Sequence, residues 1–178
     1  MNNLPWLPYL AIDFLDQWLT REMTVFEWGS GKSTGWLAQR VKQVVSIEHD
    51  AQWLIGLRDN IDLRIVPPED GSIGDNPANP HHYHSRAMGG VNFKNYATAI
   101  DEFDQFNLIL IDGRARASCF YHAIPKIAKG GFIVLDNTER DYYLAQVGSY
   151  VGKWNRITFY GDGPENTWKW ECSFFKNE

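Results

Sequence analysis

The chain has 178 residues, 44% of them hydrophobic and 22% charged, which is typical of one folded domain and argues against disorder of the whole chain. Its formal net charge is −5 and it contains no run of basic residues, so a nucleic acid is a poor candidate for its partner or substrate. Cys119 and Cys172 belong to no paired-cysteine metal motif, and we expect two reduced, buried thiols, as in a cytoplasmic protein. The domain is predicted to span residues 1–178.

An amphipathic helix is predicted within residues 1–20. Leu10, Phe14 and Trp18 follow one another at intervals of four residues, which places them on one helix face. The apolar stretch around them, residues 7–19, is shorter than the about 20 residues that span a bilayer. The N-terminus also lacks the basic region of a signal peptide. We therefore expect no association with a membrane.

Strands and helices alternate along most of the remaining chain. Short apolar runs that end at a glycine, a proline or an acidic residue predict strands, and segments with helical spacing lie between them. The predicted strands are 23–26, 44–47, 63–66, 108–111, 132–135, 156–160 and 168–175, and the predicted helices are 33–41, 51–58, 93–103, 117–127 and 142–150. Gly130-Gly131 is interpreted as the end of the fourth helix. This order predicts an α/β fold, with a parallel sheet covered on both faces and an antiparallel hairpin added at one side.

Residues 67–92 interrupt the alternation. They are rich in proline, glycine, asparagine, aspartate and histidine and show no periodicity, which predicts a long irregular loop. The loop is either a lid over the substrate or a solvent-exposed insertion. His81, His82 and His84 lie close together in it, but cysteines or acids at metal-ligand spacing do not accompany them.

A glycine-rich turn follows the first predicted strand. Gly29 and Gly31 stand between that strand and the next helix, where glycine permits a sharp turn and close approach of a ligand. A phosphate-binding loop for nucleoside triphosphates needs a further glycine at the position of Phe26. The dinucleotide fingerprint needs one at Thr34, so NAD or FAD is less favoured.

The segment Glu27-x-Gly29-x-Gly31-x-Ser33 resembles the first motif of class I S-adenosylmethionine-dependent methyltransferases. The resemblance implies a Rossmann-like three-layer sandwich whose mostly parallel seven-stranded sheet ends in a C-terminal antiparallel hairpin. It also implies that the turn packs against the methionine part of S-adenosylmethionine, and that Glu27 reaches its amino group directly or through water. The other residues expected near the cofactor are Ser30, Ser33 and Thr34. An acid suits this cationic, phosphate-free ligand and would repel a pyrophosphate.

Glu48 ends the second predicted strand, 17 residues after Gly31. An acid near this spacing grips ribose hydroxyls in nucleotide-binding α/β folds, since a carboxylate can accept two hydroxyl hydrogen bonds. We expect Glu48 and its neighbour His49 to bind the cofactor. Asp50 is expected to cap the helix that follows.

Asp112 and the pair Asp136-Asn137 end two buried strands, so they are expected at the same edge of the sheet as the glycine turn. Here the sequence resembles the metal-dependent catechol and caffeoyl-CoA O-methyltransferases. That resemblance implies Mg²⁺ bound by Asp112, Asp136 and Asn137, with the last two residues near the substrate. Those enzymes tend to have a lysine base shortly after the first aspartate, where this chain has Arg114, a clamp for an anionic substrate.

Other interpretations of these strand ends stay open. Asp112 can act as a catalytic, cofactor-side or substrate-side acid without a metal, and Asp136-Asn137 can form a turn in which Asn137 or Thr138 caps the next helix. Arg114, Arg116 and Arg140 are either ordinary solvated charges or ligands of a substrate anion.

The sequence as a whole therefore predicts methyl transfer from S-adenosylmethionine to an oxygen or nitrogen of a small-molecule acceptor. Two alternatives belong to other classes: an NAD-dependent oxidoreductase with a similar fold, and a non-catalytic domain that keeps the fold and the ligand. The acceptor itself is not encoded in a recognisable motif.

Overall fold

A computed structural model describes residues 4–53 and 58–178 of the chain. Its main feature is a seven-stranded sheet with the strand order β3-β2-β1-β6-β7-β9-β8. The strands are β1 (Thr24–Trp28), β2 (Gln43–Glu48), β3 (Ile61–Ile65), β6 (Phe106–Ile111), β7 (Ile127–Asp136), β8 (Asn155–Gly161) and β9 (Trp170–Lys176). The first five are parallel, and β9 is antiparallel to both β7 and β8. The predicted sheet and its C-terminal hairpin are confirmed.

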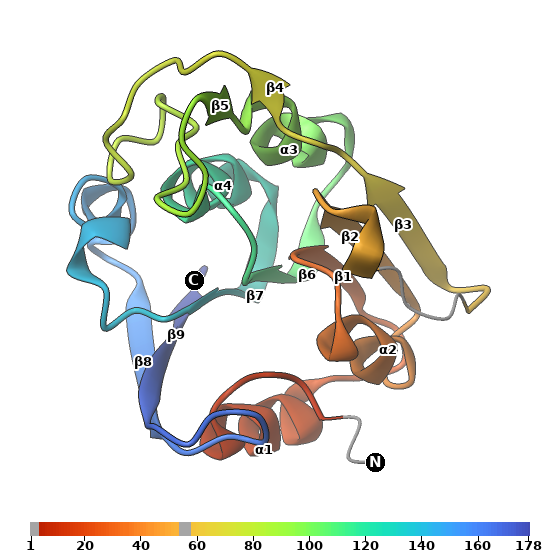
Figure 1. Cartoon of the computed structure of the whole chain (residues 1–178). Coiled ribbons are helices and arrows are strands. Elements are labelled where there is room, and N and C mark those ends of the chain that lie inside the picture. Colours follow the sequence, from red (N-terminus) through yellow and green to blue (C-terminus); the bar gives the residue numbers. More distant parts are fainter. Residues whose placement is uncertain (1–3, 54–57) are drawn as a thin grey trace.

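Helices cover both faces of this sheet, which gives three layers (Figure 1). Helices α1 (Tyr9–Trp18) and α2 (Lys32–Ala38) lie on one face, and α3 (Lys94–Thr98) and α4 (Arg116–Ala123) lie on the other. Short 3-10 helices complete the set: η1 (Ala51–Trp53), η2 (Ala99–Glu102), η3 (Ile124–Lys126), η4 (Asp141–Tyr143) and η5 (Val147–Val151). Every helix in the described part of the chain is too short or too polar to span a membrane.

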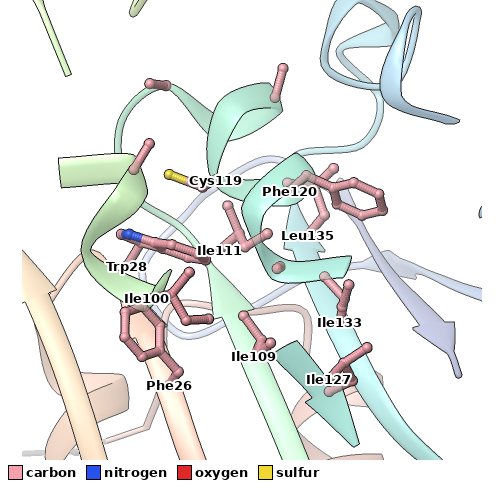
Figure 2. Packing of buried hydrophobic residues seen from close by; sticks show 14 of the residues in the cluster. Phe26, Trp28, Ile100, Ile109, Ile111, Cys119, Phe120, Ile127, Ile133 and Leu135 are labelled. Atoms are coloured by element: carbon pink, nitrogen blue, oxygen red, sulfur yellow. The ribbon is translucent and has the colours of Figure 1, made fainter. Parts of the chain in front are cut away.

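The two sheet faces bury separate apolar clusters. Figure 2 shows the cluster beneath α3 and α4, where Phe26, Ile109 and Ile133 from three adjacent strands lie under Cys119 and Phe120 of α4. These side chains have almost no exposed area, so the strands are held in one register with their carboxyl ends at a common edge. That edge carries the residues singled out above.

Two local predictions differ from the structure, and a third lies partly outside the described residues. The helix expected at 51–58 is described only as η1, because residues 54–57 lie outside the described residues. The helix expected at 142–150 is two 3-10 helices, η4 and η5. Gly130-Gly131 does not end a helix: it lies within β7, where the register shifts between Phe106 and Leu108 of β6. Gly130 has a φ of +79°, which suits a bulge as well as a helix end.

The irregular segment 67–92 is closed by a small antiparallel ladder. Strand β4 (Glu69–Asp70) pairs with β5 (Val91–Asn92). Between them the chain packs on α4: the Tyr83 hydroxyl lies 3.5 Å from Nε2 of His122, and the His81 ring lies 5.0 Å from the Tyr121 ring. Within residues 4–53 and 58–178, no three histidine, cysteine or acidic side chains gather as a metal site.

Candidate cofactor and acceptor site

The turn after β1 is shaped by Gly29. This residue has a φ of +98°, and a Cβ atom there would lie 2.9 Å from backbone atoms of Asp112 and Gly113. Glycine is therefore required at position 29 for both conformation and space. Gly31 differs, because a Cβ at that position would meet no other described atom within 4 Å. Open space thus adjoins the turn just before α2 begins, as a bound ligand would need.

Glu27 lies beneath this turn with no exposed area. Its carboxylate accepts hydrogen bonds from the hydroxyls of Ser33 and Thr34 at the start of α2 and, at 2.7 Å, from the Ser46 hydroxyl in β2. Burial raises the pKa of Glu27 to about 7, although the three hydroxyls counteract the rise. Glu27 therefore ties the turn to two strands; its predicted contact with the cofactor's amino group stays a prediction.

Glu48 holds the other side of the turn. Oε2 accepts the Ser30 N–H at 2.9 Å, and Oε1 accepts the amides of His49 and Asp50 at 2.7 and 2.9 Å. Burial pushes the pKa of Glu48 upward, but hydrogen bonds from His49 and the Asp50 amide outweigh burial and lower it. Since a carboxylate oxygen has two lone pairs, Oε2 keeps one acceptor position, as a ribose hydroxyl would require.

His49 connects Glu48 to Arg114. Its Nδ1 atom lies 2.5 Å from Oε1 of Glu48, and its Nε2 atom accepts a hydrogen bond from Nε of Arg114 at 3.3 Å. This chain of contacts spans the carboxyl ends of β2 and β6. Arg114, which we predicted to clamp the substrate, is thus placed beside a predicted cofactor residue. The predicted cap by Asp50 is confirmed, since its carboxylate accepts the Gln52 amide at 2.9 Å.

The strand-end aspartates surround an arginine. Nη2 of Arg116 lies 2.9 Å from Oδ1 of Asp112, and Nη1 lies 3.6 Å from Oδ2 of Asp136. Burial raises the pKa of both aspartates, that of Asp136 well above its ordinary value. Asn137, the third predicted magnesium ligand, directs its Oδ1 to the same guanidinium at 3.3 Å. These residues do not fit the predicted Mg²⁺, because a protein cation lies among them.

Asp136 is also poorly placed for the predicted substrate contact. It is 4% exposed, and its Oδ1 accepts a hydrogen bond from the Trp170 indole at 2.9 Å. The alternative helix cap is not found among the described residues, because η4 starts at Asp141 without a side-chain capping bond. Thr138 instead bonds to Ser173 at 2.7 Å. Asp112 is the more accessible acid, with 26% of its side chain exposed.

A cavity of about 420 Å³ lies between the irregular segment and η4. Its lining residues are Asp75, Asn76, Pro77, His84, Arg86 and Tyr142. The Arg86 guanidinium lies 4.7 Å from the centroid of the Tyr142 ring, a cation–π geometry. This volume falls within the range of small-molecule sites. Five of these six residues belong to the irregular segment and Tyr142 belongs to η4; the lid interpretation stays a prediction.

The N-terminal segment and the β8–β9 loop meet near the start of α2. The Tyr9 amide donates to the Asp162 carbonyl at 2.8 Å, and the Trp6 indole donates to Asn166 at 3.0 Å. From the same loop, Glu165 forms an ion pair with Lys32, the first residue of α2. These contacts place both segments beside the glycine turn.

No family model and no curated protein sequence matches the chain. Solved structures do match it. A candidate methyltransferase from Streptococcus mutans, in complex with S-adenosylhomocysteine (SAH), has a TM-score of 0.64 and 14% identity, covering 94% of this chain and 96% of that one. An O-methyltransferase from Bacillus cereus, also in complex with SAH, has a TM-score of 0.63 and 16% identity, with coverages of 98% and 85%. The chain has the fold of class I methyltransferases.

The methyltransferase fold alone leaves the acceptor open. An rRNA methylase from Streptococcus thermophilus also matches, with a TM-score of 0.57, 16% identity and 95% of both chains covered. Proteins named for different acceptors thus share this fold at similar identity. The fold therefore does not identify the acceptor of this chain.

The sequence-based predictions missed two residues of the site and gave a third a role that differs from the one in the structure. Ser46 was treated as part of a strand, although it shares a face with Glu48 two residues later. Trp170 belongs to the hairpin and had no signal linking it to Asp136. Arg116 was assigned to surface charge or a substrate anion, yet it is 8% exposed and lies among the aspartates.

Proposed function

We propose that this protein is an S-adenosylmethionine-dependent methyltransferase that methylates an oxygen or nitrogen of a small molecule. The observation that carries the proposal is the glycine turn: Gly29 is seated against Asp112-Gly113, and open space adjoins Gly31. Two buried acids support this turn: Glu48 accepts the Ser30 N–H, and Glu27 lies beneath the turn. The SAH bound in two compared structures of the same fold supports the choice of cofactor.

In this proposal the chain binds and orients the cofactor. Glu48 holds the turn through Ser30 and offers Oε2 to a ribose hydroxyl, while the negative charge of Glu48, whose pKa is lowered, favours a cationic ligand. His49 and Ser30 line the same strand ends, and Ser33 and Thr34 fix the start of α2. When bound, S-adenosylmethionine supplies an activated methyl group on a sulfonium. The protein then contributes mainly alignment and exclusion of water.

The acceptor is proposed to enter from the side of the irregular segment. The cavity beside η4 has a size suited to a small molecule and offers a cation, Arg86, and a ring, Tyr142. Asp112 is the candidate acid that faces the acceptor, because its side chain is the exposed one among the strand-end aspartates. The net charge of −5 disfavours a nucleic acid as acceptor.

Calorimetric titration with S-adenosylmethionine, SAH, NAD and ATP tests the cofactor assignment. We expect the two sulfur compounds to bind and the phosphate-bearing nucleotides to bind at least 10-fold more weakly. Binding of NAD in preference to S-adenosylmethionine would reject the proposal in favour of an oxidoreductase. Binding of S-adenosylmethionine without release of SAH on a broad panel of hydroxyl and amine acceptors would favour the non-catalytic domain.

A further inference from the structure

The guanidinium of Arg116 is enclosed by oxygen atoms from the carboxyl ends of two strands. Its Nε donates to the Gly113 carbonyl at 3.1 Å, and Nη2 donates to the carbonyl and Oδ1 of Asp112 at 3.0 and 2.9 Å. Nη1 donates to the Asp136 carbonyl at 2.6 Å and to Oδ1 of Asn137 at 3.3 Å. These contacts engage all the N–H donors that a guanidinium has. Arg116 therefore retains no donor for a substrate anion.

Two of these oxygen atoms, Oδ1 of Asp112 and Oδ1 of Asn137, belong to residues that the sequence predicts as ligands of a divalent cation, and the third such residue, Asp136, has its Oδ2 atom 3.6 Å from Nη1. Asp112, Asp136 and Asn137 do converge, as a metal site would require, but they converge on a nitrogen cation. Mg²⁺ binds oxygen ligands at about 2.1 Å, which is incompatible with guanidinium nitrogens hydrogen-bonded to those oxygens. Two cations this close would also repel each other strongly at a buried position.

We propose that Arg116 is the resident cation of this site, so that the protein needs no divalent metal here, and that removing its guanidinium creates a divalent-cation site. Arg116 is the first residue of α4, and it joins the ends of β6 and β7 to that helix. It compensates the buried charge of the aspartates and fixes the orientation of Asp112. This inference rests on the geometry of the strand ends and does not depend on the reaction proposed above.

The first test is binding of Mn²⁺ to the wild-type protein, followed by electron paramagnetic resonance. We expect no bound Mn²⁺ at millimolar concentration and no change in melting temperature on addition of EDTA. One tightly bound Mn²⁺ in the wild type that is lost in Asp136→Asn would overturn the proposal. This first measurement uses the wild-type protein, so its result does not depend on whether a variant folds.

The second test removes the guanidinium. Arg116→Ala removes the hydrogen-bonded partner of Asp112 and the cation beside the buried Asp136, and we expect its melting temperature to fall by about 10 °C. Mn²⁺ at about 100 times its dissociation constant should then raise that temperature by about 5–10 °C. Arg116→Gln, which keeps amide hydrogen bonds without the charge, serves if the alanine variant does not fold. Arg114→Ala is the matched control and should gain no Mn²⁺ binding. If Mn²⁺ raises the melting temperature of neither Arg116→Ala nor Arg116→Gln, the proposal is contradicted.

Discussion

Gly29 is seated directly against Asp112: a Cβ atom at position 29 would lie 2.9 Å from the Asp112 carbonyl carbon. The contact joins the glycine turn after β1 to the end of β6, so this turn and the candidate catalytic acid are packed together. The backbone at position 29 also has a φ of +98°, which side chains rarely adopt. Conformation and space therefore both restrict this position.

Gly29→Ala is expected to lower the free energy of unfolding by about 3 kcal/mol, through backbone strain and overpacking together. Gly71→Ala separates these causes, because Gly71 has a φ of +89° but open space around its Cα within the described residues. It should lose only about 1 kcal/mol. Urea unfolding of both variants provides the measurement. Equal losses would show that contact with Asp112 adds nothing.

Gly31 allows the cofactor site to be blocked while the fold is retained. A side chain there meets no described atom within 4 Å, and the extended backbone, with φ 173°, accepts any residue. If the cofactor occupies this space, Gly31→Val should weaken S-adenosylmethionine binding at least 10-fold in calorimetry with little change in melting temperature.

Gly35→Ala is the control for this experiment. Gly35 lies inside α2, and a Cβ atom there would also meet no described atom within 4 Å, but it is one helical turn beyond the glycine turn. Its replacement should leave binding unchanged and stabilise the helix by about 0.5–1 kcal/mol. Unaltered binding by Gly31→Val would place the cofactor elsewhere.

Glu27 should make stability depend on pH. Its pKa is about 7 in the folded protein, above the ordinary value of 4.5, so the folded state binds more protons between these values. Stability therefore falls as pH rises through this range, and by pH 8 the loss is on the order of 3 kcal/mol. Glu27→Gln removes the titration. Urea unfolding at pH 5 and at pH 8 measures the free energy of unfolding of both proteins. Between these pH values the variant should gain about 3 kcal/mol relative to the wild type. A difference between the two proteins that does not change with pH would disprove the raised pKa of Glu27.

Gly113 and Tyr96 form a second tight contact. A Cβ atom at position 113 would lie 2.0 Å from the Tyr96 hydroxyl, which is buried and has no hydrogen-bond partner among the described residues. Gly113→Ala should cost about 2 kcal/mol of stability, whereas Tyr96→Phe should be nearly neutral. The double variant should recover about 1 kcal/mol relative to the sum of the single changes. If the stability losses of the two single variants simply add in thermal unfolding, the Tyr96 hydroxyl is not what excludes a side chain at position 113.

The strands of the fold could be predicted because a strand that is buried on both faces consists of consecutive apolar residues. Leu108 to Ile111 and Phe132 to Leu135 are continuous apolar runs, and both are strands. Helix ends were less predictable, because the glycine pair at 130 and 131 can serve a helix end or a bulge with the same backbone angles. Only the pairing of β6 with β7 decides between them.

The places of the candidate residues in the fold were predictable, but the contacts that they make were not. Glu27, Gly29, Glu48 and Asp112 stand at strand ends, which is readable from spacing. The contacts of Arg116 with Asp136 and Asn137 join residues 20 and 21 positions apart, at opposite ends of the segment formed by α4, η3 and β7, and no periodicity encodes them. An arginine and a metal are alternative ways to compensate the same acids, so the acids alone could not indicate which cation is present.

The position of β9 constrains how the sheet can be assembled. This strand is made after β8, yet it lies inside the sheet between β7 and β8 (Figure 1). Until residues 170–176 have left the ribosome, β7 is an unpaired apolar edge and β8 has no neighbour. A nascent chain that pauses in the β8–β9 loop would therefore present an aggregation-prone edge, which makes the synthesis of the last strand the step that protects the whole sheet.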